Sequence, residues 1–251
     1  AGDTDSVSKT VSESVVTCLK TLLAPLSIIC GLSLFFTFSF SNANRIFMTQ
    51  QSESSNTDSL TVNVDLAERG YDIQICSNQL SDVGSSVAAW LERRLGASSG
   101  QQSALVVTDR NVLAHANVVR DSLSAAGFRV ELAELEPGEK TKSLSVISGL
   151  YERMVEMKAD RRAVVVAVGG GVIGDASGFL AATYNRGVPF VQFPTTLLAD
   201  VDSSVGGKVG VNLAAAKNLI GSFYQPLGVF IDTSVLSTLP DRDYRSGLAE
   251  V

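Results

Sequence analysis

The chain has 251 residues, which is enough for one α/β domain with a sizeable core and the start of a second domain. The net charge is −6 at pH 7 and no basic and aromatic stripe or repeat is present, so we expect no nucleic-acid partner. The cysteines, Cys18, Cys30 and Cys76, lack metal-ligand spacing and indicate a reducing compartment, which favours a cytoplasmic protein.

Residues 1–59 are predicted to be a doubtful or disordered leader. Residues 21–44 contain no charged side chain and are long enough to enter or span a bilayer. The region before them carries three acidic residues against two lysines, which is atypical of a secretory signal and of an organelle transit peptide. We expect the true start at Met48, and a genuine membrane anchor is the alternative. A membrane is a partner only if the leader is genuine.

From residue 60 onward the hydrophobic pattern alternates between strands and helices. Two segments that alternate apolar and polar side chains, 60–66 and 71–76, predict a hairpin or adjacent strands. The next predicted elements are a helix over 83–95, a strand over 104–108, a helix ending at Gly127, a strand over 128–135, a helix with its apolar face over 144–155 and a strand over 163–168. The order predicts a Rossmann-like, doubly wound α/β domain over 60–240, with ligands at the carboxyl ends of the strands.

A glycine motif follows the most apolar of these strands. Gly169, Gly171 and Gly174 fit G-x-G-x-x-G, in which glycine lets the backbone approach a pyrophosphate and the next helix points its positive end at that charge. The motif alone is a weak signal. The acidic residue that usually follows about 20 positions later is missing, so a nicotinamide ribose would need another ligand, for example Asp109.

Single residues near this motif also have ordinary structural interpretations. Asp175 fits a carboxylate that complements the helix start, and Thr195 and Thr196 fit an N-cap pair. Glu139 and Lys142 fit an ion pair at a helix entry. Lys208, Lys217 and Glu250 would ordinarily be surface groups. His115, the single histidine, would ordinarily be a helix-surface or partly buried residue with no chemical role.

Two longer stretches, PTTLLADVDSSVGGKVGVN and AAAKNLIGSFYQP, resemble the signature sequences of the 3-dehydroquinate synthase family. The resemblance extends from about residue 60 to the last residue and includes TDRN, PGEKTK, GGGVIGD, YNRGV, TLP and GLAEV. Fe-type alcohol and glycerol dehydrogenases share the family's fold but lack VDSSVGGK and KNLIG. Val209 stands where the family pattern has threonine, which leaves the fine substrate contacts open.

The resemblance implies an enzyme of the shikimate pathway of aromatic amino acid biosynthesis. It would convert 3-deoxy-D-arabino-heptulosonate 7-phosphate to 3-dehydroquinate and phosphate, by transient oxidation with NAD, β-elimination of phosphate, re-reduction and intramolecular aldol closure. NAD is regenerated in each turnover, so the enzyme is formally a carbon–oxygen lyase, with zinc or cobalt as Lewis acid. Homodimers are implied as well. Two alternatives remain: another sugar phosphate cyclase, or a non-catalytic NAD-binding remnant if the chain truly ends at Val251.

The resemblance also assigns residues. Lys208, Asp202, Asn218 and Arg186 match catalytic or substrate-binding positions, with Lys208 and Arg186 as cations for phosphate and carboxylate. The cofactor-binding positions are Asp109, Asn111, Glu139, Lys142, Gly170, Gly171, Val172, Asp175, Thr195, Thr196, Lys208, Lys217 and Thr238. Glu250 matches the first of three zinc ligands, and the family's other two are histidines beyond this chain. Residues 241–251 would begin a truncated, mainly helical domain, so the fragment alone is expected to be inactive.

Overall fold

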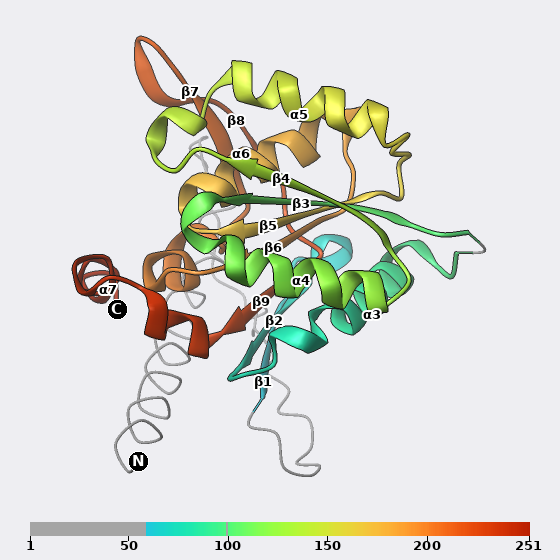
Figure 1. Cartoon of the computed structure of the whole chain (residues 1–251), viewed down its shortest axis with the longest axis horizontal. Coiled ribbons are helices and arrows are strands. Elements are labelled where there is room, and N and C mark those ends of the chain that lie inside the picture. The colour runs from blue at the N-terminus through green and yellow to red at the C-terminus, as the bar shows by residue number, and fades with distance from the viewer. Residues whose placement is uncertain (1–58, 99) are drawn as a thin grey trace, which may run out of the picture.

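The computed structural model describes residues 59–98 and 100–251. The predictions made for residues 1–58, including the apolar segment and Met48, lie outside the described residues. In the described part, a sheet of seven strands has helices on both of its faces (Figure 1). No helix in that part combines the length and the hydropathy that a membrane span requires.

The sheet is parallel except at one edge, which confirms the predicted α/β class. Its order is β1-β2-β9-β6-β5-β3-β4. The strands are β1 (Leu60–Val64), β2 (Tyr71–Cys76), β3 (Ser103–Asp109), β4 (Arg129–Leu135), β5 (Val164–Gly169), β6 (Phe190–Pro194) and β9 (Gly228–Asp232). β1 and β2, which were predicted as a hairpin or adjacent strands, pair antiparallel, and every other pairing in this sheet is parallel.

The helices match the predicted segments and follow the strands in turn. The α-helices are α3 (Val83–Leu95), α4 (Leu113–Ala125), α5 (Leu144–Glu156), α6 (Gly171–Thr183) and α7 (Asp241–Leu248). Short helical turns are η1 (Ala67–Arg69), η2 (Leu80–Asp82), η3 (Arg110–Val112), η4 (Glu139–Thr141), η5 (Tyr184–Arg186), η6 (Ala199–Ser203) and η7 (Thr233–Thr238). Gly127, with φ of +91°, follows α4 as the predicted C-terminal glycine.

One pair of strands lies outside the main sheet, and the sequence patterns did not predict it. β7 (Lys208–Leu213) and β8 (Ala216–Phe223) form an antiparallel hairpin. The hairpin lies on the same side as α5 and α6, and its tip projects from the molecule (Figure 1). Its register shifts between Val211 and Leu213, because Lys217 to Leu219 on β8 form a bulge that faces Asn212 on β7.

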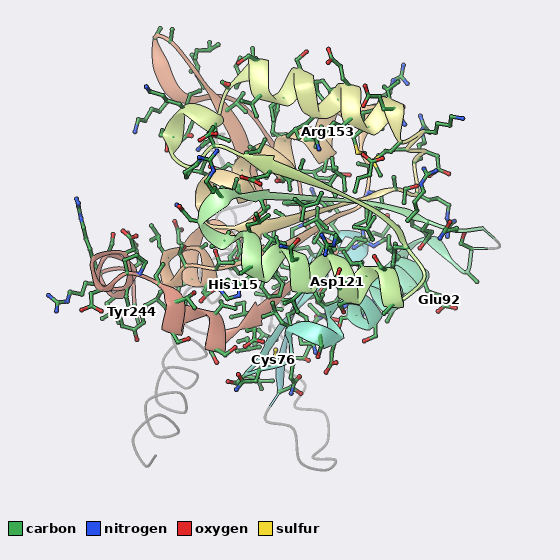
Figure 2. The ribbon with its side chains drawn as sticks, in the orientation of Figure 1. Cys76, Glu92, His115, Asp121, Arg153 and Tyr244 are labelled. Carbon is green, nitrogen blue, oxygen red and sulfur yellow. The ribbon has the colours of Figure 1, made fainter. Side chains whose placement is uncertain are left out.

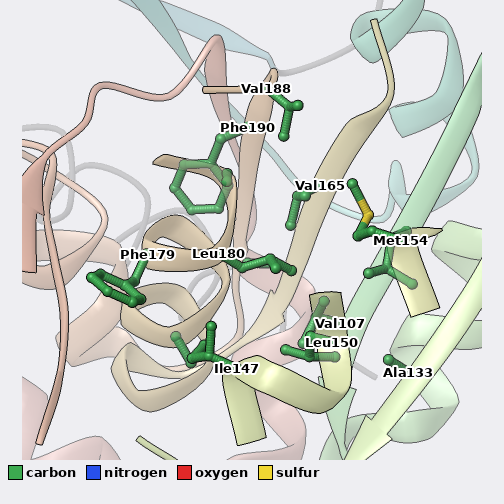
Figure 3. Packing of buried hydrophobic residues seen from close by; sticks show 14 of the residues in the cluster. Val107, Ala133, Ile147, Leu150, Met154, Val165, Phe179, Leu180, Val188 and Phe190 are labelled. Carbon is green, nitrogen blue, oxygen red and sulfur yellow. The ribbon is translucent and has the colours of Figure 1, made fainter. Parts of the chain in front are cut away.

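The core has a layer on each face of the sheet. On one face α5 and α6 pack Ile147, Met154 and Leu180 against β3, β5 and β6 (Figure 3). On the other face α3 and α4 pack Leu91 and Leu123 against the same strands. β5 is buried at every position, as expected for a central parallel strand, and this rigid centre positions the loops at its carboxyl end.

Glycines in α6 let this helix lie closer to β6 and β7 than any other residue would allow. A Cβ on Gly174 would lie 2.8 Å from Gln192 Oε1 on β6, and one on Gly178 would lie 2.3 Å from Val209 Cγ1 on β7. The third glycine of the motif therefore serves helix–strand packing, and this is the role it has in dinucleotide folds.

Gly84 brings α3 and α4 together, and its substitution gives a stability prediction. An alanine Cβ at Gly84 would lie 2.2 Å from the Ser122 carbonyl oxygen, so the two helices would have to separate. We expect Gly84→Ala to lower the free energy of unfolding by about 1–3 kcal/mol in urea denaturation. Gly149→Ala on α5 is the control: nothing lies within 4 Å of its Cβ, so a gain of up to about 1 kcal/mol is expected. Equal effects at both positions would contradict the packing argument.

Candidate nucleotide and substrate site

Most of the predicted cofactor residues meet at the carboxyl ends of the parallel strands. Asp109 ends β3, Gly170 and Gly171 follow β5, and Thr195 follows β6. Asp109 also closes the turn after β3, because its Oδ1 accepts a hydrogen bond of 2.8 Å from the backbone N–H of Asn111. Parallel strands direct their carboxyl ends to one edge, which is where this fold class binds ligands. We refer to this region as the carboxyl edge.

The start of α6 lies at this edge and has no capping side chain. Gly170 is the N-cap in extended conformation and makes no side-chain capping bond, and α6 begins at Gly171. The first backbone N–H groups of a helix have no partner within the helix, and the helix dipole adds positive potential there. A pyrophosphate at this point would be stabilised by both effects.

The two threonines after β6 differ in their environments. The hydroxyl oxygen of Thr196 accepts a hydrogen bond of 3.1 Å from the N–H of Ala199, which supports the N-cap interpretation for this residue. The hydroxyl of Thr195 is buried and has no hydrogen-bond partner among the described residues. A Cβ on Gly170 would lie 3.2 Å from Thr196 Cγ2, so the turn after β5 packs directly on the turn after β6.

Lys142 is the electrostatic centre of the site. Its side chain is 5% exposed, and its Nζ donates to Asp175 Oδ2 at 2.5 Å and to Asn218 Oδ1 at 2.6 Å. Burial raises the pKa of Asp175, the Lys142 ammonium opposes that rise, and the carboxylates of Glu139 and Asp202 add to it. One buried cation therefore lies among three acidic groups. Asp175 and Glu139 were predicted cofactor residues, and Asp202 was a predicted catalytic residue.

The partners of Lys142 and Asp175 correct two local interpretations. Glu139 and Lys142 do not pair with each other: Lys142 pairs with Asp175, and Glu139 Oε1 accepts a 2.7 Å hydrogen bond from Asn212 Nδ2. Asp175 does not cap α6, whose N-cap has no side-chain bond. The reason is that Asp175 lies in the second turn of α6, where its side chain faces the loop before α5.

The β7–β8 hairpin brings Asn218 to this centre. Asn218 has a left-handed backbone with φ of +53°, which asparagine tolerates better than most residues. Its N–H donates to Asn212 Oδ1 at 2.7 Å, and the backbone N–H of Asn212 donates to the Lys142 carbonyl at 2.9 Å. Asn212 was not among the predicted site residues, although it lies inside the GKVGVN stretch.

His115 contacts a predicted cofactor residue, although the sequence indicated no chemical role for it. His115 lies on α4 (Figure 2). Its Nε2 lies 3.0 Å from the hydroxyl oxygen of Thr238, and this contact joins α4 to η7 after β9. The hydroxyl of Thr238 donates in turn to the Val235 carbonyl at 2.7 Å. The helical pattern around His115 gave no sign of this contact, because the partner lies 123 residues away.

The side chains of three predicted cations do not join the Lys142 centre. Arg186 lies beyond the far end of α6, and 13 helical residues span about 20 Å, so it is near the amino ends of the strands. Lys208 begins β7, about 13 Å along the strand from Asn212 at 3.3 Å per residue. Lys217 on β8 is exposed. The described part of the chain therefore does not gather all predicted substrate cations in one place.

The predicted metal ligand Glu250 lies just after α7 and is exposed. Among residues 59–98 and 100–251, no three His, Cys, Asp or Glu side chains are close enough to form a metal site. Since His115 bonds to Thr238 on another part of the fold, the donors present do not fit a catalytic metal by themselves.

Comparison with known proteins places the site in a family context. Residues 132–246 match the family model for the 3-dehydroquinate synthase N-terminal region. The chain is 50% identical over 192 residues to 3-dehydroquinate synthases of Desulforamulus reducens and Geotalea uraniireducens. Each alignment covers 76% of this chain and 51% of the relative, so the chain spans about half the length of the curated relatives it matches.

This chain also covers about half the length of solved structures with the same fold. A 2-deoxy-scyllo-inosose synthase, in complex with carbaglucose-6-phosphate, NAD+ and Co2+, superimposes with a TM-score of 0.67 at 30% identity, over 75% of this chain and 50% of that one. A 2-epi-5-epi-valiolone synthase of Streptomyces hygroscopicus, with NAD+ and Zn2+ bound, gives 0.61 at 26% identity, over 81% and 50%.

Proposed function

Since residues 132–246 belong to the 3-dehydroquinate synthase N-terminal family, we propose that this chain is the NAD-binding part of such a synthase. The reaction would convert 3-deoxy-D-arabino-heptulosonate 7-phosphate to 3-dehydroquinate and phosphate, and the whole enzyme would be a cytoplasmic lyase. The observation that carries the proposal is the meeting of three distant motifs at one ammonium group: Lys142 from PGEKTK, Asp175 from GGGVIGD and Asn218 from KNLIG.

NAD fits the carboxyl edge of residues 60–240. The chemistry that this cofactor supplies when bound is reversible hydride transfer. Gly170, Gly171 and Val172 would offer backbone N–H groups to the pyrophosphate, since α6 starts there without a capping side chain. The other predicted cofactor residues on β3, η4 and η7 surround the same edge. Lys142 would orient the ligand through the amide of Asn218, which its ammonium already fixes.

The substrate would lie on the hairpin side of this edge. Asp202 is close enough to Asp175 to raise the pKa of that carboxyl group, so both belong to the same junction. Lys208 and Lys217 on β7 and β8 would supply positive charge for an anionic sugar, because a net charge of −6 makes local cations necessary. Arg186 lies at the other end of α6, and we assign it to the site of a neighbouring copy in a homodimer.

Glu250 is our proposed metal ligand from this chain. The described residues offer no complete set, so the other ligands of zinc or cobalt would come from outside the chain. Residues 241–251 would then begin a second, helical domain, consistent with α7. It follows that the chain alone would bind NAD but would not turn over substrate.

The test has a binding arm and a turnover arm. Calorimetry with the 251-residue chain should give saturable NAD binding, and the full-length protein from the same gene should release phosphate from the heptulosonate phosphate with NAD and zinc. Lys208→Ala should lower kcat/KM by about 10- to 100-fold through the loss of a charged hydrogen bond. Asn63→Asp, far away on β1, is the control. Absence of both binding and turnover would refute the proposal.

Another sugar phosphate cyclase is the second candidate, since the inosose synthase superimposes at 30% identity. The same phosphate assay separates the two, because that alternative predicts release from a different sugar phosphate and none from the heptulosonate phosphate. NAD binding without turnover of either substrate by the full-length protein would instead indicate a cofactor-binding remnant.

A further inference from the structure

Asn212 lies at the junction of two chain segments that both contact Lys142. Its side-chain Nδ2 donates to Glu139 Oε1 at 2.7 Å, and its Oδ1 accepts from the Asn218 N–H at 2.7 Å. Its backbone N–H donates to the Lys142 carbonyl at 2.9 Å, and it forms an isolated parallel bridge with Ser143. A single residue of β7 thus connects the loop after β4 to the inner side of β8.

The two neighbours fix the orientation of the Asn212 amide. A carboxylate such as Glu139 only accepts hydrogen bonds, and a backbone N–H such as that of Asn218 only donates one. The Asn212 side chain must therefore present a donor to one side and an acceptor to the other. Asparagine satisfies both, aspartate of the same shape satisfies only one, and leucine satisfies neither.

This arrangement determines where the Asn218 amide lies. Asn218 is in the left-handed region, and its Oδ1 accepts from Lys142 Nζ at 2.6 Å. The bond to Asn212 holds the Asn218 backbone at the bulge of the hairpin. Beyond this junction the hairpin is open to solvent: Leu213 is 39% exposed and Leu219 is 65% exposed. The contacts of Asn212 are therefore the ones that hold the outer part of the hairpin against the loop before α5.

We infer that Asn212 is a positioning residue, which aligns Asn218 and Glu139 on either side of Lys142 and so completes the nucleotide site. It acts through these two residues and does not itself need to touch the ligand. The part of the inference that concerns NAD rests on the proposed function. The part that concerns Asn218 stands on the contacts alone.

A double-mutant cycle in the 251-residue chain tests the assignment: Asn212→Asp, Glu139→Gln and the two combined. Asn212→Asp removes the donor and sets two carboxylates against each other, so NAD should bind at least about 10-fold more weakly by calorimetry. In the double variant the new glutamine amide can donate to the new aspartate, so affinity should return to that of Glu139→Gln alone. Such non-additivity is not expected from a general loss of stability.

Amide hydrogen exchange by NMR is the second measurement and needs no ligand. In Asn212→Leu, which removes the acceptor of the Asn218 N–H, the Asn218 amide should exchange at least about 10-fold faster, while amides of β5 keep their protection. Asn63→Leu is the matched control for exchange, and Asn63→Asp is the matched control for the binding cycle, because Asn63 Nδ2 donates to Asp72 Oδ1 at 2.8 Å on the distant β1–β2 pair. Neither control should change NAD affinity or exchange at Asn218.

The outcomes separate the two hypotheses. If wild-type chain binds no NAD, the proposed function fails and the exchange data still decide the role of Asn212. If Asn218 exchange is unchanged in Asn212→Leu, the positioning role is overturned whatever the NAD affinity. If exchange changes but NAD affinity does not, Asn212 anchors the hairpin and the link to nucleotide binding is wrong.

Discussion

Lys142→Met is expected to destabilise the fold by about 3–5 kcal/mol and to abolish measurable NAD binding. The substitution keeps most of the side-chain volume but removes the ammonium, which is 5% exposed and bonds to both Asp175 and Asn218. Asp175 would keep a partly buried carboxylate beside Glu139 and Asp202 without its counter-ion. Breaking one partner of a buried pair costs more than the pair itself contributes.

Urea denaturation from pH 4 to pH 8, with NAD calorimetry at pH 7.5, measures this effect. Loss of Lys142 removes the influence that lowers the pKa of Asp175, so that pKa rises further in the folded state. A raised folded-state pKa means that stability falls as pH rises above the unfolded value of about 3.9. The deficit should therefore be largest at pH 8 and smallest near pH 4. Lys140→Met is the control, because Lys140 is exposed. A similarly small loss in the free energy of unfolding for Lys142→Met and Lys140→Met would contradict the prediction.

Asp200→Leu is expected to raise the free energy of unfolding at neutral pH by about 1–3 kcal/mol. Asp200 is 1% exposed in η6, and neither carboxyl oxygen has a hydrogen-bond partner among the described residues. Burial raises the pKa of Asp200 well above its ordinary value, so folding favours the neutral acid. Its neighbours in sequence, Leu197 and Val201, belong to an apolar cluster that leucine would extend.

The pH dependence gives this prediction its sign. With a raised folded-state pKa, the contribution of Asp200 to the free energy of unfolding is greatest below about pH 4 and declines by up to about 1.4 kcal/mol per pH unit toward the folded-state pKa. The gain from Asp200→Leu should follow the reverse course and become small at pH 4. Asp200→Asn keeps the shape of the side chain without the charge. It should therefore remove the part of the pH dependence that Asp200 causes, and it should raise the free energy of unfolding less than Asp200→Leu does. If Asp200→Leu lowers the free energy of unfolding at pH 7, the carboxylate has a favourable partner and the argument is wrong.

Five strands of the main sheet, β1 to β5, and the helices that pack on them could be predicted from the sequence because their signals are local, whereas β6 and β9 were not predicted. The run before Gly169 is apolar at every position and became the buried β5, and Gly127 ended α4 where its left-handed φ is needed. The β7–β8 hairpin could not be predicted in this way. Its turn is Ala214–Ala215, which lacks the usual turn residues, and its strands contain glycines and an asparagine bulge.

At the site, too, features set by neighbouring residues could be predicted, and contacts between distant residues could not. Residue types at the carboxyl edge followed from motifs, but the partner of Lys142 did not, since Asp175 and Asn218 are 33 and 76 residues away. A neighbour in sequence, Glu139, was the natural choice and was wrong. The roles of the site residues and the domain boundaries at 60 and 240 stay predictions until the experiments above are made.

The separation of these partners along the chain has a consequence for folding. Contacts that close long loops are slow to form compared with helices and neighbouring turns. The ammonium of Lys142 has both of its partners only when α6 has packed on the sheet and the hairpin has docked against the loop before α5. A refolding chain should therefore regain the circular dichroism signal of its helices before it regains affinity for the nucleotide. This order should hold whether α6 or the hairpin docks last.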